Sequence, residues 1–348
     1  MMRHTGVPAA APGQEEPDEV AGGGSRVEER GHVYVPRLLT DDAMAELGAL
    51  GRRLVVGREE PPTREELLAG VAGAAAVVCT LTERVDAAVL DAAGPQLQVV
   101  ANTAVGYDNV DVPAARERGV VVTNTPGVLD RATADLTIGL VLAAARRIAE
   151  GDRFLRRGTP WIWGPRMMVG LDLSAGATLG IVGFGRIGRA VARRARAFDL
   201  RVVATPTRAE LDDDERAATE FVELPELLRR SDVVSLHCPL TPETHHLIGP
   251  GTLALMQPHA LLVNTARGGV VDTDALVTAL REGRIGGAAL DVFEDEPDVD
   301  PRLLELEQVV LTPHLGSAAS ATRSAMCRLA VANAAAVLAG RPARTPVP

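Results

Sequence analysis

A glycine-rich turn between an aliphatic segment and a helix is the feature that most constrains how this chain folds. Residues 179–182 are mostly aliphatic, residues 189–198 have the composition of a helix, and a GxGxxG motif joins them. The motif consists of Gly183, Phe184, Gly185, Arg186, Ile187 and Gly188. Glycines at this spacing allow a tight turn, close approach of the backbone to a pyrophosphate, and close packing of helix on strand. The motif therefore predicts a doubly wound α/β domain that binds a dinucleotide through these six residues.

Short strands alternate with helices on both sides of this turn. Before it, strands are expected at residues 32–35, 53–56, 76–79, 97–102 and 120–123. From the turn onward, six strands are expected at residues 177–182, 201–204, 233–237, 261–264, 287–291 and 308–311. This alternation is typical of parallel sheets covered by helices.

Two long helices suggest how the domains are connected. One is expected from Thr133 to Ile148, and the last runs from about Ser320 to Ala339. Because the second strand series is complete before the last helix, that helix is expected to return to the first domain. The sequence predicts two doubly wound parallel-sheet domains: a Rossmann dinucleotide domain (131–316) inserted into a split flavodoxin-like substrate domain (32–130 and 317–348). Residues 1–31, rich in Gly, Pro, Ala and Glu, are expected to be a disordered leader.

Composition argues against several classes of protein. The formal net charge is −10, and no basic face indicates a nucleic-acid partner. Cys79, Cys238 and Cys327 are odd in number and lack CxxC spacing, which argues against a disulfide framework and favours the cytoplasm. No apolar stretch approaches the ~18 residues of a membrane span.

Two pairs of adjacent residues are the signs of a metal site in the sequence. His237 is followed by Cys238, and His245 by His246. Adjacent residues do not share a helix face as residues four apart do, and no acid or thiol lies nearby at ligand spacing. We therefore predict no metal and interpret the histidines as surface or strand-end residues.

The strand after the glycine motif bears on the choice of cofactor. An acid at its end would bind the ribose hydroxyls of NAD. Here the first acid is Glu210, whereas Thr205, Thr207 and Arg208 are suited to a 2′-phosphate. NADP(H) is therefore favoured over NAD(H), although Arg208 can equally be a solvated loop residue.

Three residues that suit hydride-transfer chemistry follow consecutive strands of the second series. They are Arg267, Glu296 and His314. Ligands bind at the carboxyl ends of strands in open α/β sheets, so these side chains can converge there. Reduction of a keto acid needs a cation for the carboxylate and carbonyl, a proton donor, and a carboxylate that orients the donor. Taken singly, the arginine can be ion-paired, the glutamate solvated, and the histidine bonded to a backbone carbonyl.

Several strings in the right order make the chain similar to a known family. From about residue 76 to 340 it resembles the D-isomer-specific 2-hydroxyacid dehydrogenases, glyoxylate/hydroxypyruvate reductase branch. The matching strings are residues 105–111, 123–128, 132–135, 183–188, 264–268, 290–297 and 313–317.

The resemblance implies a role for each candidate residue. Arg267 binds and polarises the substrate, Glu296 supports the histidine, and His314 donates the proton. Backbone N–H groups of Val105 and Gly106 bind the substrate carboxylate, and the loop that contains Leu81 lies beside them. Cofactor contacts are expected at Thr133, Cys238, Pro239, Ala266, Asp291, His314 and Gly316.

The resemblance also implies the reaction, namely hydride transfer from NAD(P)H to C2 of glyoxylate or hydroxypyruvate. The alternatives are another D-2-hydroxy acid, or a dinucleotide-sensing regulatory protein on the same fold. NADP(H)-using relatives usually carry an arginine where this chain has Thr207, so the cofactor stays open. Dimeric relatives and the apolar helix from Thr133 favour a homodimer. A small-molecule substrate is the other expected partner.

Overall fold

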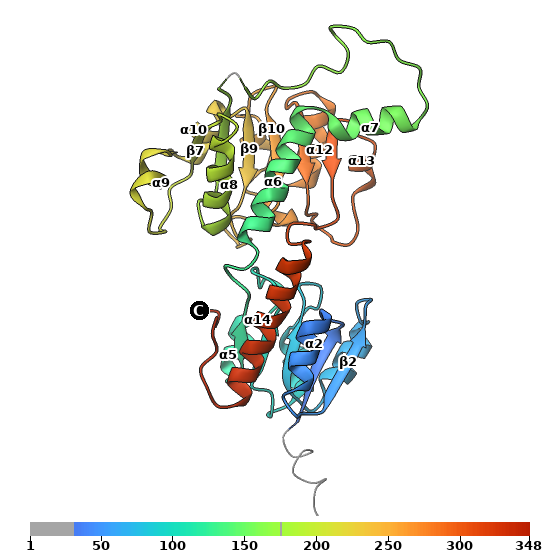
Figure 1. Cartoon of the computed structure of the whole chain (residues 1–348), viewed down its shortest axis with the longest axis vertical. Helices are drawn as coiled ribbons and strands as arrows, with labels where there is room; N and C mark the ends of the chain where they lie inside the picture. Colours follow the sequence, from blue (N-terminus) through green and yellow to red (C-terminus); the bar gives the residue numbers. More distant parts are fainter. Residues whose placement is uncertain (1–30, 175) are drawn as a thin grey trace, which may run out of the picture.

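The computed structural model describes residues 31–174 and 176–348. Two units lie one above the other along the long axis of the molecule (Figure 1). Apart from Gly31, the predicted leader lies outside the described residues. None of the helices in the described ranges is long and apolar enough to cross a membrane.

The first unit is built on a five-stranded parallel sheet of order β2-β1-β3-β4-β5, the flavodoxin-like order. Its strands are β1 (His32–Arg37), β2 (Leu54–Arg58), β3 (Ala74–Cys79), β4 (Val99–Asn102) and β5 (Val121–Thr123). The helices between them are α2 (Asp41–Gly48), α3 (Arg64–Val71), α4 (Ala87–Ala93) and α5 (Val112–Glu117). Strand β3 is apolar and buried at every position, as expected of a central strand covered on both faces.

The second unit is built on a seven-stranded parallel sheet of order β12-β11-β10-β9-β6-β7-β8. Its strands are β6 (Thr178–Val182), β7 (Arg201–Ala204), β8 (Glu220–Phe221), β9 (Val233–Leu236), β10 (Leu261–Asn264), β11 (Gly287–Leu290) and β12 (Val309–Leu311). The expectation of six strands was wrong, because two-residue β8 at the edge is too short to leave a periodic pattern. The fold class, two parallel α/β domains including a Rossmann domain, is confirmed.

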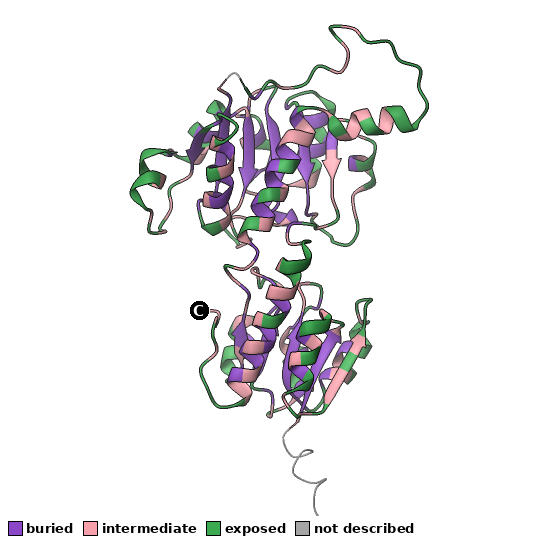
Figure 2. Ribbon diagram, in the orientation of Figure 1, coloured by how far each residue is buried: buried purple, intermediate pink, exposed green. Residues whose placement is uncertain are grey.

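Helices cover this second sheet, and buried side chains follow its strands (Figure 2). They are α6 (Asp130–Ala145), α8 (Arg186–Arg196), α9 (Asp213–Ala217), α10 (Leu224–Arg230), α11 (Pro250–Leu253), α12 (Thr273–Arg281) and α13 (Pro301–Leu304), with the 3₁₀ turn η1 (Gly268–Val270).

The predicted long helix from Thr133 to Ile148 was wrong at its C-terminal end. Helix α6 stops at Ala145, and a separate helix, α7 (Ile148–Arg156), follows. Arg147 between them has φ 52°, in the left-handed region that ends a helix. Its guanidinium lies 2.6 Å from Glu150, in the first turn of α7.

The last helix returns to the first unit. Helix α14 (Ser320–Leu338) packs on α2, β3 and β4, whereas α6 packs on α8, β10 and β11. Because of these contacts, we propose that residues 32–130 and 317–348 form one domain and residues 131–316 the other, as predicted.

Candidate active site

The glycine turn leads from β6 into α8. Gly183 has φ 94°, and a Cβ on it would lie 2.5 Å from the backbone nitrogen of Cys238. A Cβ on Gly188 would lie 2.4 Å from the carbonyl oxygen of Gly183, so both glycines are needed for packing. Gly185 faces open space, and no side chain caps α8 there. The free N–H groups at this helix start, with exposed Arg186 beside them, fit the pyrophosphate of a dinucleotide.

The two threonines after β7 shape this turn. Thr205 Oγ1 accepts a hydrogen bond from Gly183 N at 3.0 Å, and Thr207 Oγ1 donates to the Phe184 carbonyl at 3.2 Å. Arg208 is exposed and has no hydrogen bond or ion pair with any described residue. It is therefore the group at this strand end that is available to an anion.

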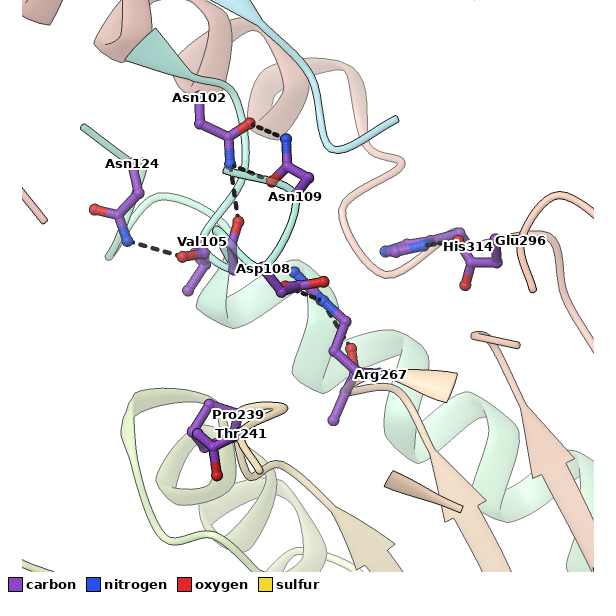
Figure 3. Close-up of polar contacts among 12 residues, drawn as sticks. Asn102, Val105, Asp108, Asn109, Asn124, Pro239, Thr241, Arg267, Glu296 and His314 are labelled. Atoms are coloured by element: carbon purple, nitrogen blue, oxygen red, sulfur yellow. Dashed lines mark hydrogen bonds and ion pairs between the residues drawn. The ribbon is translucent and has the colours of Figure 1, made fainter. Parts of the chain in front are cut away.

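His314 and Glu296 form the predicted pair. His314 Nδ1 lies 2.7 Å from Glu296 Oε2, while Phe293 N donates to Glu296 Oε1 at 3.0 Å. The ring is thus held by a carboxylate and not by a backbone carbonyl. Its Nε2 has no partner among the described residues and faces the space beside Arg267 (Figure 3).

Glu296 carries a negative charge at neutral pH. Burial acts to raise its pKa, but the hydrogen bond and charge of His314, the Phe293 N–H and the charge of Arg267 outweigh burial and hold the pKa below its ordinary value. An ionised Glu296 can therefore keep Nδ1 of His314 protonated and stabilise an imidazolium.

A buried carboxylate shapes the loop that carries the histidine. Asp291 accepts hydrogen bonds from Thr312 Oγ1 at 2.6 Å, Leu315 N at 2.7 Å and Gly316 N at 2.8 Å. His314 has φ 52°, a strained conformation that these bonds support. Asp291 was also predicted as a cofactor contact, and that contact stays a prediction.

Thr133 and Gly316 lie together, near the two places where the chain passes between the two units. A Cβ on Gly316 would lie 3.5 Å from Thr133 Oγ1. Thr133 is buried, and Thr137 one turn later bonds to the hydroxyl of Thr265 at 3.0 Å, next to Ala266. Thr133, Ala266 and Gly316 were predicted as cofactor contacts, and the fold brings these three small residues to one part of the site.

Arg267 reaches from the second unit to the first. Its Nε donates to Asp108 Oδ1 at 2.9 Å, and Nη1 donates to the Ala266 carbonyl at 2.8 Å. A Cβ on Gly106 would lie 1.7 Å from Nη2 of Arg267. Asp108 was not predicted as a site residue, although it lies within the matching string of residues 105–111.

Three asparagine side chains brace the Val105–Gly106 turn. Asn102 Nδ2 donates to the Gly106 carbonyl at 2.9 Å and Asn124 Nδ2 to the Val105 carbonyl at 2.8 Å. Asn109 Nδ2 donates to Thr80 O at 3.0 Å, which ties the loop containing Leu81 to this turn. The two carbonyls are thus hydrogen-bonded, whereas the N–H groups of Val105 and Gly106 have no partner among the described residues.

Neutral side chains follow β9 near the glycine turn. His237 Nε2 lies 2.8 Å from Ser235 Oγ, and burial lowers the pKa of His237 to about 3. Burial raises the pKa of Cys238 to about 11. The three cysteines are unpaired. The Pro239 carbonyl accepts a hydrogen bond from Thr244 at 2.6 Å. These residues form an uncharged wall beside Gly183.

The fold brings an acid to His245 and His246 that is not near them in the sequence. His246 Nε2 lies 2.5 Å from Glu294 Oε1, and the rings of His245 and His246 stack at 3.9 Å. In the described part of the chain these three residues are the one group whose candidate metal-ligand atoms lie within 4.8 Å of one another. Glu294 is far away in sequence, so spacing did not reveal it.

A guanidinium, a histidine–carboxylate pair and two free N–H groups thus surround one space at the ends of the strands. The N–H groups and the guanidinium suit a carboxylate, and the histidine suits proton donation to a neighbouring oxygen. With an uncapped glycine turn beside them, the fold and the site define a two-domain, dinucleotide-dependent oxidoreductase.

The family follows from comparison with known proteins. The model of the D-isomer specific 2-hydroxyacid dehydrogenase NAD binding domain matches residues 138–316. A glyoxylate reductase of Thermococcus litoralis is 48% identical over 284 residues, covering 80% of this chain and 85% of that protein. One of Korarchaeum cryptofilum is 51% identical over 278 residues, covering 79% and 83%. The chain belongs to the D-isomer-specific 2-hydroxyacid dehydrogenases, which confirms the resemblance.

Solved structures agree with this assignment. The TT0316 protein from Thermus thermophilus has a TM-score of 0.84 at 48% identity, with 91% of this chain and 100% of that chain covered. An NADPH-dependent glyoxylate/hydroxypyruvate reductase from Sinorhizobium meliloti, in complex with NADP and malonate, has a TM-score of 0.78 at 34% identity, with 91% and 97% covered.

Proposed function

We propose that this dehydrogenase reduces glyoxylate or hydroxypyruvate with NADPH to the 2-hydroxy acid, of D configuration where C2 is a stereocentre. The observation that carries the proposal is the position of Arg267 against the Val105–Gly106 turn, with the His314–Glu296 pair facing the same space. The names of the relatives, glyoxylate reductases at 48% and 51% identity, support the substrate.

The substrate carboxylate is bound by the N–H groups of Val105 and Gly106, and the guanidinium of Arg267 binds and polarises the keto acid. This local set of donors attracts an anion despite the net charge of −10. Leu81, half-buried on the neighbouring loop, provides an apolar wall.

The chain's own groups stabilise the charge that develops on the substrate oxygen. Bound NADPH supplies the hydride that C2 receives. Arg267 lowers the energy of the developing alkoxide, and His314 transfers its Nε2 proton to that oxygen. The ionised Glu296 stabilises the imidazolium before this transfer and keeps the ring aligned. The neutral imidazole left behind regains a proton from water.

Preference for NADPH is supported at the end of β7. Thr205 and Thr207 are engaged with the glycine turn, and no acid stands between Ala204 and Arg208. The free guanidinium of Arg208 is the group proposed to bind the 2′-phosphate. In Arg208→Ala, kcat/KM with NADPH should fall by about 10-fold and kcat/KM with NADH should hardly change, as a charge-assisted hydrogen bond implies. Equal loss with both cofactors would contradict this role.

We also propose a homodimer in the cytoplasm. Six of the twelve large apolar side chains that are exposed in the described chain lie on α7 and the segment after it. This part of the chain extends away from the second unit (Figure 2). The six side chains are Ile148, Leu155, Trp161, Ile162, Trp163 and Val169. Exposed large apolar side chains gathered on one segment support an interface with a second copy. Light scattering should give the mass of two subunits, and a mass near one subunit would reject the dimer.

The decisive experiment is a panel of 2-keto acids assayed with NADPH and with NADH. Glyoxylate and hydroxypyruvate should give the highest kcat/KM, and NADPH the higher value of the two cofactors. A higher kcat/KM with a bulkier keto acid would overturn the substrate. Tight dinucleotide binding without reduction of any keto acid would overturn the catalytic function and favour a dinucleotide sensor.

A further inference from the structure

The loops that carry Arg267 and Glu296 are in backbone contact. A Cβ on Gly268 would lie 1.9 Å from the carbonyl carbon of Phe293 and 2.3 Å from the backbone nitrogen of Glu294. Glu296 follows two residues later and bonds to Phe293 N. The place of the Phe293–Glu296 segment therefore affects both the arginine and the histidine–carboxylate pair.

One side chain ties this segment to its surroundings. Glu294 Oε1 lies 2.5 Å from Nε2 of His246, and Glu294 Oε2 accepts a hydrogen bond from the Thr273 hydroxyl at 2.7 Å. The backbone N–H of His246 in turn donates to Gly269 O at 2.8 Å. Thr273 is the first residue of α12, which follows the Arg267 loop. Glu294 thus links the loop after β11 to His246 and Thr273. His246 is bonded to the loop that carries Arg267, and Thr273 follows that loop.

The contact is built from an ionised carboxylate and a strained backbone. Burial acts to raise the pKa of Glu294, but the hydrogen bonds from His246 and Thr273 outweigh it and hold the pKa below its ordinary value. His246 has φ 51°, and its ring stacks on that of His245 with the centroids 3.9 Å apart. A non-glycine residue stays in this region only where its surroundings hold it there.

We propose that Glu294 is a positioning residue for the reaction, which with His246 and Thr273 holds the loop of residues 291–297 where Glu296 pairs with His314. Glu294 does not touch the reacting atoms and acts through Glu296. The proposal rests on the proton-donor role given to His314 in the proposed function. None of the comparisons or sequence motifs assigns this role to Glu294.

The neighbouring acid supplies a matched control. Asp295 is exposed, carries the same charge, and its side chain has no hydrogen bond or ion pair with any described residue. Glu294→Ala should lower kcat by about 10-fold, because a shift of Glu296 by less than 1 Å should cost less than the about 100-fold loss of a full 1 Å misplacement. The KM for NADPH should stay within about twofold, and Asp295→Asn should match the wild type.

The solvent deuterium isotope effect on kcat separates positioning from a merely structural role. In Glu294→Ala it should rise above the wild-type value, because proton transfer from a misaligned His314 becomes more rate-limiting. A wild-type kcat and isotope effect in this variant would overturn the proposal. If Glu294→Ala does not fold, Glu294→Met keeps most of the volume but removes the bonds to both His246 and Thr273, and an unchanged isotope effect in that variant is equally decisive.

A double-mutant cycle tests whether His246 is the partner. Asn tolerates the positive φ of residue 246, so His246→Asn removes the ring without forcing the backbone. If both act through one contact, the double variant with Glu294→Ala should lose no more kcat than Glu294→Ala alone. Additive losses would reject the pairing. All rates are compared with the wild type on its best keto acid, so an inactive wild type refutes the proposed function, whereas an active and insensitive enzyme refutes only the positioning role.

Discussion

Replacement of Gly106 by Ala should disable the site without unfolding the protein. The new Cβ would lie 1.7 Å from Nη2 and 2.5 Å from Cζ of Arg267. Ordinary contact requires about 3.5 Å, so the guanidinium must retreat by roughly 1.5–2 Å. The obstructing atoms belong to the end of a flexible side chain and φ of Gly106 is not in the left-handed region, so the fold can absorb the change.

The expected cost follows from this displacement. A misplacement of about 1 Å at a catalytic group can cost about 100-fold, so kcat/KM for the keto acid should fall at least that far, or about 2.7 kcal/mol of transition-state stabilisation. The assay is the decrease in NADPH absorbance at varied substrate concentration. NADPH affinity and Tm should remain near wild type, because neither the glycine turn nor the core is touched.

Gly139→Ala is the matched control. Gly139 is an exposed residue of α6, and a Cβ there meets nothing within 4 Å. Its activity should equal the wild type, and its stability should rise by up to about 1 kcal/mol because alanine favours a helix. If kcat/KM of Gly106→Ala stays within about threefold of wild type, the reaction does not depend on the position of the Arg267 guanidinium against the Val105–Gly106 turn.

Three further variants test the remaining groups. His314→Asn should lower turnover by orders of magnitude with cofactor affinity retained, and unchanged turnover would remove its role as proton donor. Asp108→Ala frees Nε of Arg267 and should lower kcat/KM about 10-fold; Asp91→Asn, which breaks the exposed ion pair with Arg118, should have no effect on rate. Because the pKa of Glu296 is lowered in the folded state, its stabilising effect is present above about pH 4.3 and is lost as the pH falls through the folded-state pKa. The Tm difference between wild type and Glu296→Gln should therefore shrink below about pH 4, and a constant difference across that window would contradict the assignment.

The cofactor turn and the three strand-end residues were visible in the sequence for a physical reason. A strand, a glycine turn and a helix are consecutive, so their pattern is local, and Gly183, Gly185 and Gly188 occupy the places that the pattern requires. In a parallel sheet all carboxyl ends lie at one edge. The sheet therefore places His314 and Glu296 at the same edge, where they form a hydrogen bond.

Tertiary structure decided what depends on residues far apart in the chain. Asp108 meets Arg267 from another domain, and Glu294 meets His246 across 48 positions. Asp291 is three-fold hydrogen-bonded by the histidine loop, which no spacing rule reveals. Local composition shows which residues favour a helix or a turn. The break after Ala145 did not follow from composition, because it depends on the positive φ of Arg147. Which charge faces which depends on packing, and packing is a property of the whole fold.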